Sequence, residues 1–455
     1  MKRTLFSFLE AWHDSYQRKP LVIRGARQVG KTWLVRHFAQ TQKKNIYEIN
    51  FEKNPQLISL FESNDVRQVL LNLSSLFDQK IDIKQSLLFL DEVQAAPEIL
   101  SKLRWFAEDL GDLPVIAAGS LLEFTLDKHA FSMPVGRIQY MHLEPLSFEE
   151  FLQAKNKQML VEYLNVYNLN TVIPAAIHEK LMTDFKEYLI IGGMPAAVNS
   201  WIHQNSLKDV NQIHHDLIST YRDDFARYSG RLDIERLDEV MMAVPKFLGE
   251  KFVYSRVNPT IHTSAIKQSL DLLCKARVCH RVMGTAANGV PLLGEILNRH
   301  MKVIFLDVGL CSAALGLTLD FVTLNEISLI NKGAIAEQIV GQLLRTINSP
   351  YIEPTLTYWH REEKGSNAEI DYVIQHGHRV IPIEVKAGST GGLKSLHLFM
   401  GLKGYSFAVR FNSDVPSHGN VEVKDQQGNL VKYHLLSLPF YLLGQLHRLI
   451  DDFKK

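Results

Sequence analysis

The sequence predicts an α/β protein built from more than one domain. Its first third alternates short apolar runs with helical patterns, which is typical of a parallel sheet flanked by helices. Helical patterns dominate from about residue 148 to residue 283, and strand patterns return after residue 333. A chain of 455 residues also exceeds what one hydrophobic core usually organises. We therefore expect domains at residues 1–150, 151–332 and 333–455.

The first domain is expected to contain five strands, each a short apolar run bounded by turn or polar residues. They cover residues 21–25, 45–51, 87–91, 115–120 and 140–143. The segments between them are long enough for helices and have helical patterns, so the strands should run parallel to one another.

A phosphate-binding loop follows the first of these strands. The chain matches G-x-x-x-x-G-K-[ST] between a strand and a helical run, which is the context that this motif requires. The glycines allow backbone N–H groups to surround phosphates; we expect Lys31 to reach the β and γ phosphates of ATP and the Thr32 hydroxyl to bind Mg²⁺. Outside that context, the same letters would be a plain glycine turn. The predicted ATP-binding residues are Gly25, Ala26, Arg27, Gln28, Val29, Gly30, Lys31 and Thr32.

Two adjacent carboxylates end the third expected strand. The apolar run at residues 87–90 is followed directly by Asp91 and Glu92. We expect Asp91 to hold Mg²⁺ through water and Glu92 to polarise the water that attacks the γ phosphate. Acidic residues often end strands without any catalytic role, but the phosphate loop upstream favours the catalytic interpretation.

Two further residues are candidates for sensing or stabilising the γ phosphate. Ser120 ends the fourth expected strand, where its hydroxyl could sense the phosphate, although it could equally be a helix cap. Arg137 follows a proline and glycine turn and is a candidate for stabilising charge on the transferred phosphoryl group, the alternative being an ordinary surface arginine.

The middle region is predicted to be helical and to end in a winged-helix unit. A helical block at residues 264–275 precedes a segment at residues 276–282 that could be a strand. Scattered basic residues around it, such as Arg256 and Lys267, could meet a nucleic-acid backbone, but no dense basic stripe is present. His214 and His215 are adjacent on a helix, face different directions, and are expected at the surface.

The last third is expected to be a second α/β domain. It reads as a helix at residues 334–344, three strands at 356–362, 370–374 and 380–385, a helix at 393–402 and a strand at 405–411. Three E-x-K triplets occur in it, so the letters alone carry no information. The triplet at Glu384 and Lys386 differs from the others because it lies in an alternating strand directly after the strand that contains Asp371.

Strand alternation places the polar residues of these two strands together. A period of two puts Glu384 and Lys386 on one face of their strand, and it puts Asp371 opposite Ile370 and Tyr372 on the preceding strand. Upstream, Glu337 falls at the edge of the apolar arc of its helix, where its carboxylate could turn inward.

These residues form a candidate metal site. Glu337, Asp371 and Glu384 would supply hard oxygen ligands for Mg²⁺ or Mn²⁺, and Lys386 would orient or activate water for phosphodiester hydrolysis. This order of helix and strands is similar to the PD-(D/E)xK nuclease superfamily, which implies a restriction-endonuclease-like fold. Two alternatives stay open: solvated faces of half-buried strands, or a nuclease fold that only binds.

Several motifs together resemble a bacterial and archaeal family of AAA+ ATPases that carry a C-terminal domain of unknown function. The matching segments are RGARQVGKT, LLFLDEVQ, AAGSLLEF, Gly136-Arg137 leading to LEPLSFEEFL, YLIIGGMPAAV and FLDVGL. The resemblance covers nearly the whole chain. It implies an ATPase core with an additional strand, a winged-helix segment and a nuclease-like C-terminal fold.

The bulk composition is that of an ordinary soluble protein and indicates no particular partner. Apolar residues make up 46% of the chain, charged residues 22%, and the formal net charge is +1, so any nucleic-acid surface must be a local patch. The three cysteines form no paired pattern, which favours a reducing compartment. Charges interrupt the N-terminal segment, and no apolar run approaches the roughly 18 residues of a membrane span. We expect a cytoplasmic protein that does not contact a membrane.

Two functions fit these observations. The first is an ATPase coupled to a metal-dependent nuclease that acts on DNA or RNA. The second is a regulatory switch in which ATP changes self-association into a homo-oligomer or partner binding, and the C-terminal domain is an inactive docking module. A metal-dependent cleavage assay separates the two.

Overall fold

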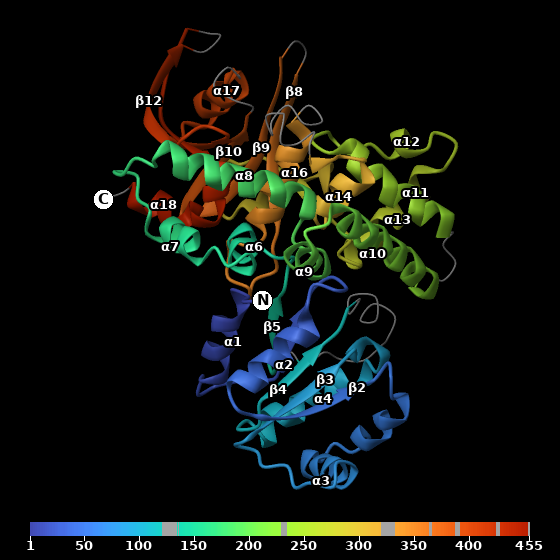
Figure 1. The fold of residues 1–455 in the computed structure, drawn as a ribbon. Helices are drawn as coiled ribbons and strands as arrows, with labels where there is room; N and C mark the ends of the chain where they lie inside the picture. Colours follow the sequence, from blue (N-terminus) through green and yellow to red (C-terminus); the bar gives the residue numbers. More distant parts are fainter. Residues whose placement is uncertain are drawn as a thin grey trace. The chain divides into compact units, whose positions relative to one another are not determined.

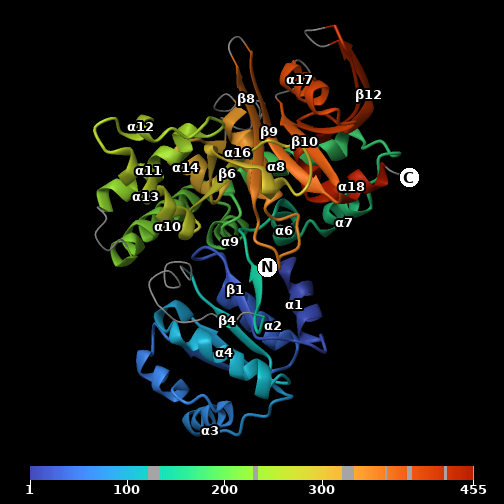
Figure 2. The same cartoon turned by 180° about the vertical axis from the view of Figure 1, so that it is seen from behind.

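The chain forms two compact units in the computed structural model, which describes residues 1–120, 134, 136–228, 234–319, 333–363, 366–386, 392–424 and 428–453. Unit 1 comprises Met1–Glu144 with two short segments, Lys275–Arg277 and Ser349–Pro354. Unit 2 comprises Pro145–Cys274, Val278–Asn348 and Thr355–Lys455. Figures 1 and 2 show the elements of both units from opposite sides.

Unit 1 contains the parallel five-stranded sheet that the sequence predicts, so this part of the prediction is confirmed. The strand order is β2-β3-β4-β1-β5, and every neighbouring pair is parallel. The observed bounds differ from the predicted ones by one or two residues. The strands are β1 (Leu21–Arg24), β2 (Asn45–Asn50), β3 (Ser86–Asp91), β4 (Val115–Ala118) and β5 (Gln139–His142).

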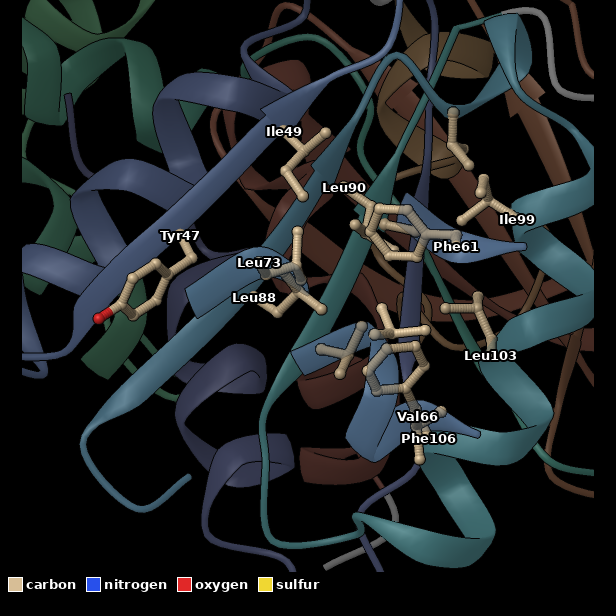
Figure 3. Packing of buried hydrophobic residues seen from close by; sticks show 14 of the residues in the cluster. Tyr47, Ile49, Phe61, Val66, Leu73, Leu88, Leu90, Ile99, Leu103 and Phe106 are labelled. Carbon is tan, nitrogen blue, oxygen red and sulfur yellow. The ribbon is translucent and has the colours of Figure 1, made fainter. Parts of the chain in front are cut away.

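Helices cover the sheet of unit 1 and bury its central strands. Every residue of β3 is buried, as expected for a strand covered on both faces of a parallel sheet. Figure 3 shows Leu88 and Leu90 of β3 in the core cluster together with Leu103 and Phe106 of α4. This packing fixes the end of β3, where Asp91 begins the candidate site. The helices are α1 (Leu5–His13), α2 (Lys31–Thr41), α3 (Val66–Leu76) and α4 (Glu98–Asp109), with 3-10 turns η1 (Pro55–Phe61) and η2 (Val93–Ala95).

Unit 2 is built around an eight-stranded mixed sheet. The strand order is β12-β13-β11-β10-β9-β8-β6-β7, with parallel pairs at β10/β11, β11/β13 and β6/β8. The predicted strands of the last third are all present among its members. The strands are β6 (Cys279–Thr285), β7 (Ile296–Phe305), β8 (Leu356–Glu363), β9 (Ser366–His376), β10 (Arg379–Val385), β11 (Phe407–Asn412), β12 (Ser417–Lys424) and β13 (Leu430–Pro439).

Helices of the middle and last thirds complete unit 2 (Figure 1). Among the described residues, no helix of either unit is long and apolar enough to cross a membrane. The helices are α6 (Phe148–Ala154), α7 (Gln158–Val166), α8 (Ala175–Ile191), α9 (Pro195–Gln204), α10 (Leu207–Tyr228), α11 (Ile234–Ala243), α12 (Tyr254–Val257), α13 (Thr263–Lys275), α14 (Val308–Ala314), α16 (Ala334–Leu344), α17 (Lys394–Lys403) and α18 (Leu446–Asp452), with 3-10 turns η3 (Val244–Phe247), η4 (Leu292–Glu295) and η6 (Phe440–Gln445).

The middle and last thirds of the chain share one sheet. The segment predicted as a winged helix contributes α13 and the hairpin β6–β7, and β6 also pairs with β8. Contacts therefore divide the chain near residue 145, close to the predicted boundary at 150, and do not divide it near residue 333. The winged-helix and restriction-endonuclease-like assignments stay predictions.

The expectation that His214 lies at the surface is wrong. Its side chain is fully buried, and its Nε2 lies 3.0 Å from the carbonyl oxygen of Ile191. Helix α10 packs against α9 and α14, so one of the two adjacent histidines must face these helices, and His215 is the exposed one.

Candidate functional site

The phosphate loop of unit 1 has a backbone shape that requires its glycines. Gly30 has a φ of 98°, in the left-handed region, and is the N-cap residue directly before helix α2. At Gly25 an added Cβ would collide with the carbonyl oxygen of Leu143. Gln28 also has a positive φ, of 62°, which is uncommon for a residue with a side chain and often marks a functional loop. The loop thus leads from β1 into the N-terminus of α2, where N–H groups can bind an anion.

Two basic side chains, those of Lys31 and Arg3, donate hydrogen bonds to backbone carbonyl oxygens of this loop. The Lys31 ammonium donates hydrogen bonds to the carbonyl oxygens of Gly25 at 3.0 Å and Ala26 at 2.8 Å. The buried Arg3 guanidinium donates to the carbonyl oxygen of Val29 at 2.9 Å. Arg3 was not singled out from the sequence, because it lies outside the motif and is close to it only in the fold.

The expected magnesium ligands lie side by side. Thr32 Oγ1 lies 3.1 Å from Asp91 Oδ2, and the Asn50 amide donates to the same oxygen at 3.3 Å. Asn50 and Asp91 are register partners at the carboxyl ends of β2 and β3, the edge at which parallel sheets usually bind ligands. Burial, together with the charge of Glu92, raises the pKa of Asp91 to about 6, while the hydrogen bond from Thr32 opposes this shift. A bound cation would favour the ionised form.

Glu92 is held in an unusual conformation next to this cluster. Its φ of 52° lies in the left-handed region, and its Oε2 accepts a hydrogen bond of 2.6 Å from the Gln94 amide. Such a conformation costs on the order of 1–3 kcal/mol for a residue with a side chain, and it persists only where the surroundings impose it. The turn after β3 therefore fixes both the backbone and the carboxylate of Glu92.

The other two candidates of unit 1 lie at opposite edges of the sheet. Ser120 follows β4 at the same edge as Asp91, and its buried hydroxyl has no hydrogen-bond partner among the described residues. Arg137 precedes β5, which runs parallel to β1, so it lies at the edge where β1 begins rather than where the phosphate loop follows. There its Nε donates to Glu108 Oε1 at 2.8 Å. The structure thus does not bring Arg137 to the phosphate loop of its own chain.

The four candidates of unit 2 form one cluster. Val385 N, between Glu384 and Lys386, donates a hydrogen bond of 2.7 Å to Asp371 Oδ2, and Lys386 Nζ lies 2.8 Å from Glu384 Oε1. Glu337, on α16, has a carboxylate oxygen within 4.8 Å of one of Asp371, and both carboxylates lie near the Lys302 ammonium. Residues from one helix and two strands therefore meet, in the order expected from the sequence.

The predicted alternation of β9 fails beside this cluster. Thr357 pairs with Val373 but Trp359 pairs with Ile370, so β9 has one residue more than β8 between these pairs. Such a bulge breaks the period of two. As a result Tyr372 does not lie opposite Asp371 as predicted; its hydroxyl donates to the Glu337 carbonyl oxygen at 2.8 Å, toward the helix that carries Glu337.

Two residues of the cluster were not predicted from the sequence. Lys302 on β7 pairs with Glu337 Oε2 at 2.9 Å and also with Glu369. Glu369 lies two residues before Asp371, so the alternation argument could have found it. Lys302 could have been noticed as a lysine in the apolar second half of its strand, between Met301 and Val303, but nothing in the sequence indicates its partners.

Burial and mutual repulsion dominate the electrostatics of this cluster. Burial, and then the charge of Asp371, raise the pKa of Glu384 to about 8 against the effect of Lys386. Burial also raises the pKa of Glu337 to about 8, with Lys302 acting in the opposite direction. Burial would lower the pKa of Lys302, but Glu337, Asp371 and Glu369 outweigh it and raise that pKa, so Lys302 stays charged.

The donor set fits a divalent cation of the Mg²⁺ or Mn²⁺ type. All its ligands would be carboxylate oxygens, which such ions prefer. Glu384 is only 2% exposed, yet its Oε2 has no hydrogen-bond partner among the described residues. A buried carboxylate oxygen without a partner is costly, and a metal ligand role would satisfy it.

The other E-x-K triplets lack such surroundings. Glu422 lies on β12, where its side chain is exposed and pairs with the exposed Lys432 of β13 at 2.8 Å. The triplet that begins at Glu362 ends at Lys364, which lies outside the described residues.

Comparison with protein families identifies the domain in unit 1. Residues 17–152 match a family model described as an AAA domain, so the chain carries an AAA-type ATPase domain. Residues 182–320 and 332–434 match two models described as domains of unknown function. No curated protein is similar enough in sequence to count as a match.

Solved structures give only distant similarity. The Aeropyrum pernix ORC1 protein in complex with DNA has 10% identity and a TM-score of 0.28, with 69% of this chain and 90% of that chain covered. A signal transduction ATPase with numerous domains and a tetratricopeptide repeat sensor from Pyrococcus horikoshii has 14% identity, a TM-score of 0.25 and shares of 76% and 46%. C. elegans PCH-2 has 13% identity, a TM-score of 0.25 and shares of 48% and 61%. TM-scores this low establish no common overall fold.

Proposed function

We propose that this protein hydrolyses ATP in unit 1 and is a metal-dependent nuclease in unit 2. The match of residues 17–152 to an AAA domain supports the first part. The second part depends on one observation, the meeting of Glu337, Asp371, Glu384 and Lys386 in a single cluster. DNA or RNA is the proposed substrate of unit 2.

ATP hydrolysis would use the residues at the carboxyl edge of the unit 1 sheet. The loop N–H groups and Lys31 bind the β and γ phosphates, for which Lys31 must exchange its bonds to the Gly25 and Ala26 carbonyls. Thr32 and Asp91 would hold Mg²⁺, which when bound neutralises charge that develops on the phosphoryl group. Glu92, oriented by the Gln94 amide, accepts hydrogen bonding from the attacking water and polarises it.

Arg137 would contribute to ATP hydrolysis only from a neighbouring copy of the chain. Because Arg137 lies at the opposite edge of the sheet, it can act on ATP only in a homo-oligomer, where it would reach the nucleotide of another subunit. Its partner in the single chain is the exposed Glu108, a contact that an oligomer could replace at little cost.

Phosphodiester cleavage would use the residues of the unit 2 cluster. Asp371 and Glu384 would hold Mg²⁺ or Mn²⁺, which when bound acts as a Lewis acid on a phosphate oxygen. The Lys386 ammonium, one-third exposed and held by Glu384, can orient the attacking water toward phosphorus. Glu337 adds negative charge that strengthens binding of the cation.

One observation favours the alternative, a regulatory ATP switch whose second unit only docks a partner. Lys302 already pairs with Glu337 and Glu369 and lies 3.9 Å from Asp371, so part of the acidic charge is neutralised within the chain. A cluster neutralised in this way would need less metal, or none.

Cleavage of labelled nucleic acids tests the proposal. Full-length protein is incubated with single-stranded, duplex and branched DNA and RNA in Mg²⁺ or Mn²⁺, with and without ATP. The proposal predicts cleavage that EDTA abolishes and that Asp371→Asn lacks. The absence of cleavage by wild-type protein on every substrate would favour the regulatory switch instead.

A further inference from the structure

Lys302 is the most deeply buried cation of the unit 2 cluster. It lies on β7, between the apolar residues Met301 and Val303, and only 4% of its side chain is exposed. A lysine is almost never buried to this extent unless its charge is paired. Its Nζ also lies 5.4 Å from the centre of the Tyr358 ring, which adds a favourable cation–π contact.

Three carboxylates surround the Lys302 ammonium. It pairs with Glu337 at 2.9 Å and with Glu369, and it lies 3.9 Å from Asp371. One oxygen of each of these carboxylates lies within 4.8 Å of the others, a spacing that would also suit a metal ion. Without a cation, three charges this close would repel one another strongly in a buried site. The ammonium therefore occupies the place where their charges converge.

The net charge of the ionised cluster is one that a single divalent ion would neutralise. Glu337, Glu369, Asp371 and Glu384 face two ammonium groups, those of Lys302 and Lys386, which leaves a formal charge of −2 when all six groups are ionised.

The four carboxylates of this cluster differ in how directly they pair with Lys302. Asp371 Oδ2 accepts from Val385 N, and its Oδ1 lies 3.9 Å from Lys302 Nζ. Glu384 Oε1 faces Lys386, and its Oε2 has no hydrogen-bond partner among the described residues. Glu337 and Glu369, by contrast, each present an oxygen to Lys302. Asp371 and Glu384 therefore pair less directly with Lys302 than Glu337 and Glu369 do, and they are the carboxylates better placed to hold an ion.

We propose that the Lys302 ammonium fills one of two cation positions in this cluster, so that the site takes a single divalent ion, held by Asp371 and Glu384. Sites with two ions usually hold them about 3.5–4 Å apart around shared carboxylates. Here Asp371 would be shared between the ammonium and the ion. The remaining ion rests on the proposed nuclease function, whereas the replacement of an ion by Lys302 does not.

Counting bound Mn²⁺ tests this proposal. Nucleotide-free, full-length wild-type protein, Lys302→Met and Lys302→Gln are titrated with Mn²⁺, and free ion is measured by electron paramagnetic resonance. Removing the ammonium frees Glu337 and Glu369 as ligands, so we expect both variants to bind one more Mn²⁺ per chain than wild type. Equal numbers in wild type and both variants would overturn the proposal.

The same titration separates this proposal from the nuclease proposal. If wild type binds one ion that Asp371→Asn loses, and the Lys302 variants bind two, both proposals are supported. If wild type binds none at this cluster and the Lys302 variants bind one, Lys302 still replaces an ion, but the metal-dependent nuclease is contradicted. Ions bound elsewhere cancel in the difference between variants.

Two control variants and a melting measurement accompany the titration. Lys302→Arg keeps the charge and should bind the same number of ions as wild type. Lys432→Met removes an exposed lysine whose partner is the exposed Glu422, at 2.8 Å, and should also leave the number unchanged. Melting of Lys302→Met and Lys302→Gln should shift upward with Mn²⁺ by more than wild type does, because the added ion replaces the lost charge. No greater shift in either variant would count against the proposal.

Discussion

Thr32 Oγ1 lies 3.1 Å from Asp91 Oδ2, although the two residues are 59 positions apart in the chain. The contact exists because β1 and β3 are parallel members of one sheet, so the loop after β1 and the end of β3 reach the same edge. A magnesium ligand and the start of a catalytic turn are thereby placed beside the phosphate loop. Thr32 and Asp91 are therefore expected to hold the Mg²⁺ of bound ATP, whereas Glu92, the next residue, is expected to polarise the attacking water.

Replacing Glu92 by glutamine should separate binding of ATP from its hydrolysis. Gln has nearly the same size and can keep contact with Gln94, but it lacks the charge that polarises water. We expect ATP to bind with little change while turnover falls by about a hundredfold or more. Nucleotide binding by calorimetry and phosphate release measure the two effects.

The matched control is Glu98→Gln, which changes an exposed carboxylate at the start of α4. It should leave both binding and turnover unchanged. Hydrolysis by Glu92→Gln at the wild-type rate would make Glu92 an ordinary residue at a strand end.

Changes to the unit 2 cluster should abolish cleavage and spare ATP hydrolysis. Asp371→Asn and Glu384→Gln keep side-chain size but each removes a charged ligand, so Mg²⁺- or Mn²⁺-dependent cleavage should fall below detection. Phosphate release from ATP should stay within about twofold of wild type, because neither residue belongs to unit 1. Glu422→Gln, which changes the exposed glutamate of another triplet, should affect neither activity. Equal loss of cleavage in Glu422→Gln would show that the assay does not report on this cluster.

Lys386→Ala should distinguish the water-orienting residue from the metal ligands. Its ammonium pairs with Glu384 but is not itself a metal ligand, so Mn²⁺ should still bind while cleavage is lost. Mn²⁺ titration and the cleavage assay measure this split. Cleavage at the wild-type rate would exclude the proposed role of Lys386.

Buried His214 should make the protein less stable as the pH falls. Burial lowers its pKa to about 4, whereas an unfolded histidine titrates near 6.5. Below about pH 6.5 the unfolded chain binds a proton that the folded chain does not, so stability is lost as pH falls toward 4. His214→Gln removes this dependence. The free energy of unfolding of the variant, relative to that of wild type, should therefore rise by about 2 kcal/mol when the pH is lowered from 7 to 5.

Urea unfolding at the two pH values measures this shift, with His215→Gln as the control. His215 is the exposed neighbour on α10, so its replacement should give the wild-type pH dependence. A wild-type pH dependence in His214→Gln as well would contradict burial of an uncharged imidazole.

The sequence was most informative where the determining residues are close together in the chain. The phosphate loop and the end of β3 could be predicted because each is a continuous segment with a fixed backbone requirement. The alternation argument also predicted that Asp371 and Glu384 lie together, although the bulge in β9 breaks this alternation at Tyr372. The position of Arg137 could have been predicted as well, since a residue that precedes a parallel strand must lie at the edge away from the phosphate loop.

Other features depend on contacts that no local pattern encodes. Tyr372 turns toward α16 because β9 has an extra residue relative to β8, and a bulge of this kind requires knowledge of both strands. Lys302 meets Glu337 only because β7 and α16, separated by the described helix α14, pack together. Burial of His214 rather than His215 likewise depends on how α10 packs.

Mg²⁺-dependent release of phosphate from ATP, measured for wild type and Lys31→Ala side by side, tests the central claim most directly. We expect turnover by wild type and none above background in Lys31→Ala, with ATP binding sharply weakened, because Lys31 is the cation expected to reach the β and γ phosphates. Equal phosphate release by the two proteins, or none by wild type, would contradict it.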